Sequence, residues 1–349
     1  MNTVQVAALS VRAPLGWLGP GRRVENVSVV IDHDVIVYAG EPRGAPPTEV
    51  TVLVDGVVLP AAADRHVHMG LADPGAVLLG GVTAVRDLAW PPEEIFPLAD
   101  ASEGPSFNGP LVRAAGPMLT APAGYPTRAS WAPQGTGLEV RGPEEATRAV
   151  AGLAERGAAH IKVSLNAEAG PTLGDGELLA IVAAAHEREL PVTAHVQGRG
   201  QAERALGAGI DELAHCPWSE KVPDPVIEAM ARSMRIVSTL DIHSYGEDTP
   251  EVRVAMDNLS RFARDGGRVR YGTDLGNGPV PPGIDVREVM LLFQSGLAPE
   301  DVLTAMMRAP LEPGAPADLI GVARDPLEDL EALGDLRLVM RGGRIVLQR

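Results

Sequence analysis

The sequence predicts an α/β fold, a parallel (β/α)8 barrel accompanied by a small β-rich unit at the ends of the chain. Two observations favour it. Short β-branched segments alternate with helical patterns eight times, a rhythm that is typical of parallel barrels. Polar residues follow several of these strands, at the ends where barrel active sites are built. The runner-up, an open doubly wound sheet, is weakened because no Gly-x-Gly-x-x-Gly follows the first strand.

The first barrel strand is expected in the apolar run 56–63, just before His66. The other seven are predicted from short apolar segments, at residues 82–87, 111–115, 160–165, 191–196, 210–215, 235–240 and 268–274.

Helices are predicted between several of these strands. The segment 143–156 begins with proline and carries Glu144 and Glu145 in its first turn, which is a good start signal. Further helices are expected at residues 175–188, 201–206, 225–231, 251–264 and 285–294. The regions 97–114 and 116–142 are rich in Pro, Gly and Ser and are interpreted as loops.

Both ends of the chain are rich in predicted strands. These lie at 3–9, 24–31, 35–38 and 49–54, with a hairpin turn at 32–34, and again at 317–322 and 336–346, with a turn at 341–343. The later strands could complete the first unit. We therefore expect a composite β-domain from residues 1–56 and 310–349, and a barrel domain from residues 57–309.

Composition limits the class of protein. The 349 residues are 45% hydrophobic and carry a net charge of −16, which argues against nucleic acid and anionic membranes as partners. Cys216 is the only cysteine, so no disulfide can form within the chain. The first nine residues do not resemble a signal peptide, and no apolar run reaches membrane-spanning length. We expect a cytoplasmic enzyme with a small-molecule substrate, and leave open a homo-oligomer.

His66 and His68 are the centre of the pattern. They lie two apart at the end of the first strand, so both should point the same way and could bind one divalent metal. A bare His-x-His is weak evidence, since two histidines in a turn are common.

Lys162 is one of only two lysines, against 28 arginines. In the strand 161–165 it has the parity opposite to the apolar residues, so it should point into the barrel. One interpretation is an ammonium paired with a carboxylate near the barrel mouth. The other is a neutral amine that has captured carbon dioxide, giving an anionic carbamate that can bridge two metals, a reaction that arginine cannot perform.

Three more strands end in residues that can bind metal. His195 and His215 close successive strands, and Asp274 closes the eighth in the tetrapeptide Tyr-Gly-Thr-Asp. Asp274 could instead cap the next helix. Cys216 has the opposite parity to His215 and is interpreted as a packing residue.

Together these features resemble the amidohydrolase superfamily of metal-dependent hydrolases, over nearly the whole chain. The stretches around Lys162 and His195 are most similar to the branch of imidazolonepropionases and Xaa-Pro dipeptidases. The resemblance implies that the composite domain is a β-sandwich. Two departures stand out: Gly-Tyr-Pro at 124–126 replaces a Gly-Gly-His of many relatives, and the segment 307–312 is shortened.

The resemblance also implies a mechanism. His66, His68 and Asp274 would hold one divalent metal, and His195 and His215 a second, with carboxylated Lys162 between them; zinc is the expected metal. A hydroxide bridging the metals would attack the substrate, and Asp274 would move its proton to the leaving group. Asp274 and Lys162 are thus the expected catalytic residues.

Three functions follow as hypotheses. The first is a two-metal hydrolase of an amide C–N bond, in an Xaa-Pro dipeptide or N-acyl amino acid. The second is a one-metal deaminase, cyclic amidohydrolase or lactonase acting on a neutral ring. The third is an inactive ligand-binding protein on the same frame, a hypothesis suggested by an aromatic content of only 3%. Candidate substrate contacts lie on strand-end loops: Tyr125, Arg128, Arg199, His243 and Tyr245. Arg128 or Arg199 could bind a substrate carboxylate.

Overall fold

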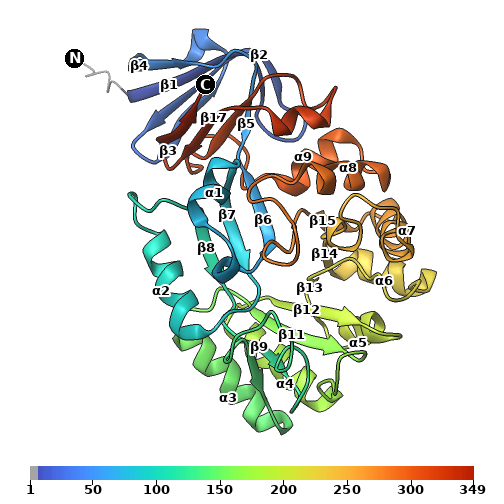
Figure 1. Ribbon diagram of the computed structural model, residues 1–349. Coiled ribbons are helices and arrows are strands. Elements are labelled where there is room, and N and C mark those ends of the chain that lie inside the picture. Colours follow the sequence, from blue (N-terminus) through green and yellow to red (C-terminus); the bar gives the residue numbers. More distant parts are fainter. Residues whose placement is uncertain (1–6) are drawn as a thin grey trace.

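The computed structural model describes residues 7–349 and has an α/β fold with three β-sheets (Figure 1). Two of the sheets are parallel, and strands from both chain ends build the third. The α/β class predicted from the strand–helix rhythm is confirmed. Among the helices of residues 7–349, none combines the length and apolarity that a bilayer span requires.

The larger parallel sheet has the strand order β10-β9-β11-β12-β13-β14-β15, and the smaller one has the order β6-β7-β8. The strands are β6 (Ala62–Val67), β7 (Val82–Asp87), β8 (Leu111–Ala114), β9 (Met118–Thr120), β10 (Gly137–Glu139), β11 (Ile161–Asn166), β12 (Val192–Gln197), β13 (Glu212–Leu213), β14 (Arg235–Val237) and β15 (Arg268–Arg270).

Backbone hydrogen bonds connect the two parallel sheets on both flanks. On one flank the Asp274 amide donates to the His66 carbonyl at 2.8 Å, and the Arg65 amide donates to Tyr271 at 3.0 Å. On the other flank the Ala159 amide, just before β11, donates to Ala114 of β8 at 2.9 Å. The ends of β6 and of the segment after β15 are therefore held side by side, and this contact positions the candidate site.

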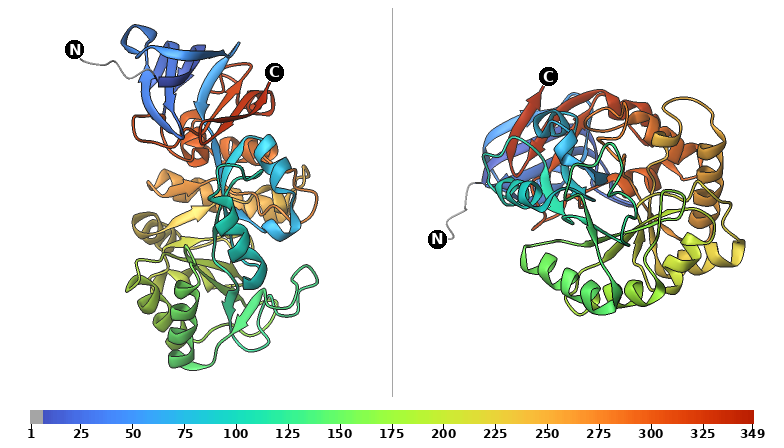
Figure 2. Two further views of the ribbon diagram at one scale, coloured as in Figure 1. Left: turned by 90° about the vertical axis from the view of Figure 1, so that its left-hand side faces the viewer. Right: turned by 60° about the horizontal axis from the view of Figure 1, so that its bottom comes forward.

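Helices follow most of the parallel strands and pack on their outer faces, as the two views of Figure 2 show. They are α1 (Pro74–Leu79), α2 (Pro92–Ser102), α3 (Gly142–Glu155), α4 (Asp175–His186), α5 (Gln201–Gly207), α6 (Asp224–Ser233), α7 (Pro250–Arg264), α8 (Val286–Gln294) and α9 (Pro299–Met306), with 3-10 turns η1 (Pro42–Gly44), η2 (Met69–Leu71), η3 (Asp241–His243) and η4 (Leu330–Gly334).

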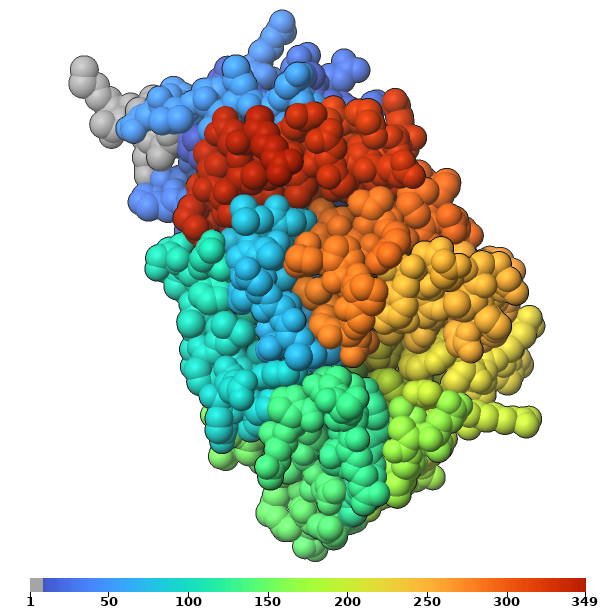
Figure 3. Space-filling model, viewed as in Figure 1, coloured from blue at the N-terminus to red at the C-terminus, as the bar shows by residue number. Residues whose placement is uncertain are grey.

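The eight-stranded sheet joins the two ends of the chain, seen as blue and red segments side by side in Figures 1 and 3. Its strands are β1 (Ala7–Trp17), β2 (Arg23–Asp32), β3 (Val35–Gly40), β4 (Thr48–Leu53), β5 (Val57–Pro60), β16 (Leu319–Val322), β17 (Leu336–Arg341) and β18 (Arg344–Gln348). Its key pairing is antiparallel, between β5 and β16, and aligns Pro60 with Leu319. Val11, Val29 and Leu338 belong to a second buried core on this sheet.

Several boundaries differ from the sequence prediction. The loop predicted at 97–114 is wrong for its first part, because α2 continues to Ser102 around Pro97; buried Ile95 and Phe96 anchor that helix. The strand predicted at 3–9 lies partly in residues 1–6, outside the described part, and β1 continues to Trp17 despite Pro14 and Gly16. The turns predicted at 32–34 and 341–343 are confirmed.

Candidate metal centre

His66 and His68 lie at the end of β6 and are both 2% exposed. The Nδ1 atom of His66 is 2.8 Å from the Ala214 carbonyl, and that of His68 is 3.0 Å from the Ala89 carbonyl. A carbonyl only accepts hydrogen bonds, so both Nδ1 atoms must carry the hydrogen. In a neutral ring the Nε2 atom is then left with a free lone pair, which is the state that binds metal.

Asp274 completes a group of three converging ligand atoms. Its Oδ1 atom lies 3.1 Å from His66 Nε2 and 3.2 Å from His68 Nε2, and all three residues are buried. Three acceptor atoms this close repel one another unless a cation lies between them. Tetrahedral zinc with bonds of roughly 2.0–2.1 Å places its ligand atoms about 3.3 Å apart, so the described residues fit a metal ion.

The pKa shifts show the same demand for positive charge. Burial would raise the pKa of Asp274, but the two histidines outweigh it and hold this pKa well below its usual range. Burial places the pKa of His66 well below its ordinary value. Burial also opposes protonation of His68, yet the hydrogen bond and charge of Asp274 outweigh it and raise that pKa. Without metal, a proton on His68 would supply part of the missing charge.

Lys162 of β11 is fully buried, and its Nζ atom has no hydrogen-bond partner among the described residues. Burial lowers the pKa of this amine to about 7; Asp274 opposes the shift and Arg86 adds to it. An ammonium paired with a carboxylate, one of the two sequence-based interpretations, would have an acceptor within hydrogen-bond distance. The unpartnered amine is instead partly neutral near pH 7.

His195 of β12 and His215 after β13 face the same space, with ring centroids 4.9 Å apart. His215 Nδ1 lies 2.9 Å from the Thr239 hydroxyl, which leaves its Nε2 free. His195 Nε2 lies 3.3 Å from the Asn166 amide nitrogen, so Nδ1 is the nitrogen left for a metal. All six predicted ligands line one cavity of about 170 Å³.

The backbone around this cavity is strained in two places. Asp274 has φ +56° and Thr239 has φ +43°, a left-handed conformation that is unfavourable for a β-branched residue such as threonine. Asp64 holds the segment before Asp274, because its carboxylate accepts hydrogen bonds from the His66 amide, the Thr273 amide and the Thr273 hydroxyl. Strain at ligand-bearing residues is typical of functional sites.

Sequence reasoning missed an aromatic wall around the cavity. Trp218 stacks on His243 with centroids 4.3 Å apart and meets the edge of His215 at 5.3 Å. Trp131 lies 4.5 Å from the His68 ring and donates from Nε1 to the Tyr125 hydroxyl at 3.1 Å. The position of Trp218 in the sequence could have indicated its role, because Trp218 follows the predicted strand that ends in His215. Three aromatic residues, Tyr125, Trp131 and Trp218, therefore lie in or beside the cavity, which weakens the main argument for an inactive protein.

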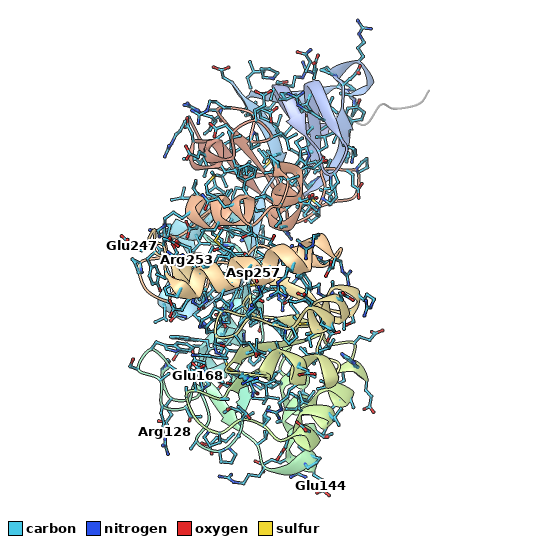
Figure 4. The ribbon with its side chains drawn as sticks, turned by 90° about the vertical axis from the view of Figure 1, so that its right-hand side faces the viewer. Arg128, Glu144, Glu168, Glu247, Arg253 and Asp257 are labelled. Carbon is cyan, nitrogen blue, oxygen red and sulfur yellow. The ribbon has the colours of Figure 1, made fainter. Side chains whose placement is uncertain are left out.

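The five predicted substrate contacts divide into two groups. Tyr125 and His243 line the cavity. Tyr245 is 38% exposed just beyond η3. Arg128 and Arg199 are exposed, and Arg128 lies on a loop at the molecule's periphery (Figure 4). Among the described residues that line the cavity there is no arginine.

The fold and this cluster resemble those of the amidohydrolase superfamily, and comparison with known proteins supports this resemblance and the likeness to its prolidase-like branch. Ochratoxinase from Aspergillus niger is 25% identical, over 94% of this chain and 84% of the relative. An uncharacterized protein of Mycobacterium tuberculosis is 26% identical, over 84% of this chain and 86% of the relative. Comparison with protein-family models finds no match.

Solved structures agree. A Xaa-Pro dipeptidase with bound methionine superposes with a TM-score of 0.82 at 20% identity, covering 97% of this chain and 99% of its own. The crystal structure of A. niger ochratoxinase gives a TM-score of 0.84 at 21% identity, covering 99% and 96%. These likenesses show that this chain shares the fold of the two proteins.

Proposed function

We propose that this chain is a metal-dependent hydrolase that cleaves an amide C–N bond of a small molecule, such as an Xaa-Pro dipeptide or an N-acyl amino acid. The observation that carries the proposal is the convergence of His66 Nε2, His68 Nε2 and Asp274 Oδ1, three buried acceptors within 4.8 Å of one another. Such a group is stable only around a cation.

The proposed frame is a closed (β/α)8 barrel, predicted at residues 57–309, with a composite β-sandwich, predicted at residues 1–56 and 310–349. The first boundary needs one correction, because β5 (Val57–Pro60) pairs with β1 and β16 of the eight-stranded sheet and the first barrel strand is β6, which begins at Ala62. The hydrogen bonds that connect the two parallel sheets on both flanks support closure. The separate core of the eight-stranded sheet, and its strands from both chain ends, support the second domain.

The proposed cofactors are two divalent metal ions, with zinc as the first choice. His66, His68 and Asp274 would hold one, and His195 and His215 the other, with Lys162 serving both as its carbamate. When bound, such metals polarise a carbonyl group and lower the pKa of water to about 7. The imidazole and carboxylate donor set suits zinc.

Two residues of the chain have proposed chemical roles. The neutral Lys162 amine would form an N–C bond with carbon dioxide and release one proton, which gives the site a second anionic group. Asp274 would accept the proton of the attacking water and pass it to the leaving amine. The depressed pKa of Asp274 keeps its carboxylate ionised at neutral pH.

Tyr125 and His243 are proposed to orient the substrate. The Tyr125 oxygen accepts from Trp131, so its own hydrogen is free to donate; burial and Asp274 raise its pKa, which keeps the phenol protonated. His243 Nε2 is a buried atom without a hydrogen-bond partner among the described residues. Burial lowers the pKa of His243 to about 4, so the ring is neutral at pH 7.

One observation favours a second candidate, a lactonase, deaminase or cyclic amidohydrolase acting on a neutral ring. A substrate carboxylate normally requires a cationic partner, and the cavity lining described above contains no arginine. Arg128 or Arg199 would have to reach the cavity from outside. A neutral ring needs no such partner and would pack against Trp218 and Tyr125.

A substrate screen decides between these candidates. The metal-loaded protein is tested against Xaa-Pro dipeptides, N-acyl amino acids, ochratoxin, lactones and cyclic amides. Arg128→Ala and Arg199→Ala are run beside wild type, with Arg232→Ala on the exposed side of α6 as matched control. Cleavage of carboxylate-bearing amides, with a higher KM for one loop variant only, supports the first candidate. Hydrolysis of neutral rings alone supports the second. No turnover by metal-loaded protein across the panel would leave a ligand-binding protein.

A further inference from the structure

A group of arginines lies where the eight-stranded sheet meets the connection between α2 and β8 (Figure 1). Arg341 of β17 and Arg344 of β18 are directly paired across these antiparallel strands, so their side chains leave the same face of the sheet. Both donate to the carbonyl oxygen of Phe107, Arg344 at 2.8 Å and Arg341 at 3.5 Å. Two guanidinium groups therefore share one neutral acceptor.

A third guanidinium group lies at the same turn. Arg308, which follows α9, forms an ion pair with Oδ2 of Asp318. The other oxygen of Asp318 accepts a hydrogen bond of 2.7 Å from the amide of Gly342, the residue after Arg341. Burial lowers the pKa of Arg308 to about 10, and repulsion from Arg341 and Arg113 adds to the shift. The guanidinium groups are thus close enough to repel one another.

The carboxylates nearby do not balance these three charges. In residues 7–349, Asp318 is the one carboxylate within 4.0 Å of Arg308, Arg341 or Arg344. Carbonyl oxygens satisfy N–H groups but carry no net charge, so two positive charges stay unbalanced, in a chain whose net charge is −16. The Nε atom of Arg344 is also buried without an acceptor among the described residues. A contact that only joined the sheet to the barrel would not require this excess of charge.

All three arginines line one cavity of about 550 Å³. The ion pair of Arg113 with Glu103 also lines it, as does Asp34, and these three residues are exposed. They therefore form the outer rim, whereas the unbalanced charge lies deeper. The cavity shares no lining residue with the metal centre. Its volume is in the range of roughly 300–1,000 Å³ that is usual for small-molecule sites.

We propose that this cavity binds a phosphate group, either free or carried on a small molecule. A phosphate monoester carries about −1.5 to −2 charges at pH 7, which matches the two unbalanced positive charges. Guanidinium groups bind phosphate through two parallel hydrogen bonds. Among the described residues Arg308 donates through Nη1 alone, so its Nε and Nη2 groups, which lie on one side of the guanidinium plane's edge, are available for such a pair. The volume leaves room for a group attached to the phosphate.

Calorimetric titration of the purified full chain with inorganic phosphate and with glucose 6-phosphate tests the proposal. At least one of them should bind, glucose should not, and added salt should weaken binding. Tighter binding of the ester would identify a phosphorylated molecule as the ligand, and any other order would identify free phosphate.

Variants locate the bound anion. Arg344→Gln should weaken binding by roughly tenfold or more, and Arg344→Lys, which keeps the charge but loses the planar fork, should weaken it to a smaller extent. Arg337→Gln is the matched control on β17, because this half-exposed side chain pairs with Asp335 and does not line the cavity. Circular dichroism verifies the fold of each variant, and Arg344→Lys serves as the test if Arg344→Gln does not fold.

Three results would overturn the proposal. The first is that neither phosphate compound binds to wild type. The second is binding that the Arg344 variants leave unchanged, because the anion would then lie elsewhere on the molecule. The third is binding that a chelator abolishes, because the anion would then lie at the metal centre.

Discussion

The buried amine of Lys162 should lower the stability of the metal-free protein, and this effect can be measured. This amine has a pKa of about 7 in the fold, against 10.5 for an ordinary lysine. Folding at neutral pH must therefore remove a proton that the Lys162 amine binds in the unfolded chain. One pKa unit corresponds to about 1.36 kcal/mol, so the destabilisation at pH 7 is about 4 kcal/mol. Because the folded-state pKa is lowered, this destabilisation is fully present below pH 7 and disappears as the pH rises through 10.5.

Lys162→Met has nearly the same shape and no charge. In chelator and buffer free of carbon dioxide, it should raise the free energy of unfolding by about 4 kcal/mol at pH 7 and by under about 1 kcal/mol at pH 10. Urea unfolding of wild type and variant measures this difference. Lys221→Met is the control, because that lysine is exposed beside Asp257 and such pairs contribute at most about 1 kcal/mol.

A Lys162→Met variant no more stable than wild type at pH 7 would refute the reasoning. It would mean that the amine keeps its proton and has found a partner, so that the carbamate would lose its chemical basis. A gain independent of pH would instead indicate improved apolar packing.

Four further outcomes are expected. Elemental analysis of protein purified without chelator should give about two metals per chain, and His66→Ala should lose at least one; metal-free wild type would contradict the site. Asp274→Asn should lower kcat by at least about 10³-fold while most metal stays bound, so near-normal turnover would remove Asp274 from proton transfer. Tyr125→Phe should lower kcat/KM by roughly 10- to 100-fold with unchanged metal content, and unchanged kcat/KM would exclude the proposed hydrogen bond. Lys162→Ala should be inactive and partly rescued by short carboxylic acids with bicarbonate.

The ligand residues could be predicted because each lies within a strand or shortly after one in the sequence. The His-x-His spacing at 66 and 68 and the parity of Lys162 depend only on the period of a strand. The carbonyl partners on Ala214 and Ala89 could not be predicted, because they lie after other strands, 148 and 21 residues along the chain, and meet the histidines only in the folded protein. The left-handed conformation of Asp274 depends on the same tertiary contacts.

Local composition misled the prediction at α2 and in the long segment 116–142. Pro97 suggested a loop, but the helix is held by buried Ile95 and Phe96. The segment 116–142 does contain mainly loop, yet β9 and β10 pair within it and hold Tyr125 and Trp131 near the histidines. Loops acquire such roles through packing, which sequence periodicity does not report.

The pairing of β5 with β16 has a consequence for how the chain must fold. Pro60 lies opposite Leu319, so almost all the parallel strands are synthesised between two partners of one sheet. That sheet cannot close until the last strands have left the ribosome, whereas β6 follows β5 after the single residue Ala61. The closing of this long loop is entropically tolerable but slow. Until it is complete, the apolar edge of β5 is exposed, and the interval between synthesis and closure is when aggregation is the greatest hazard.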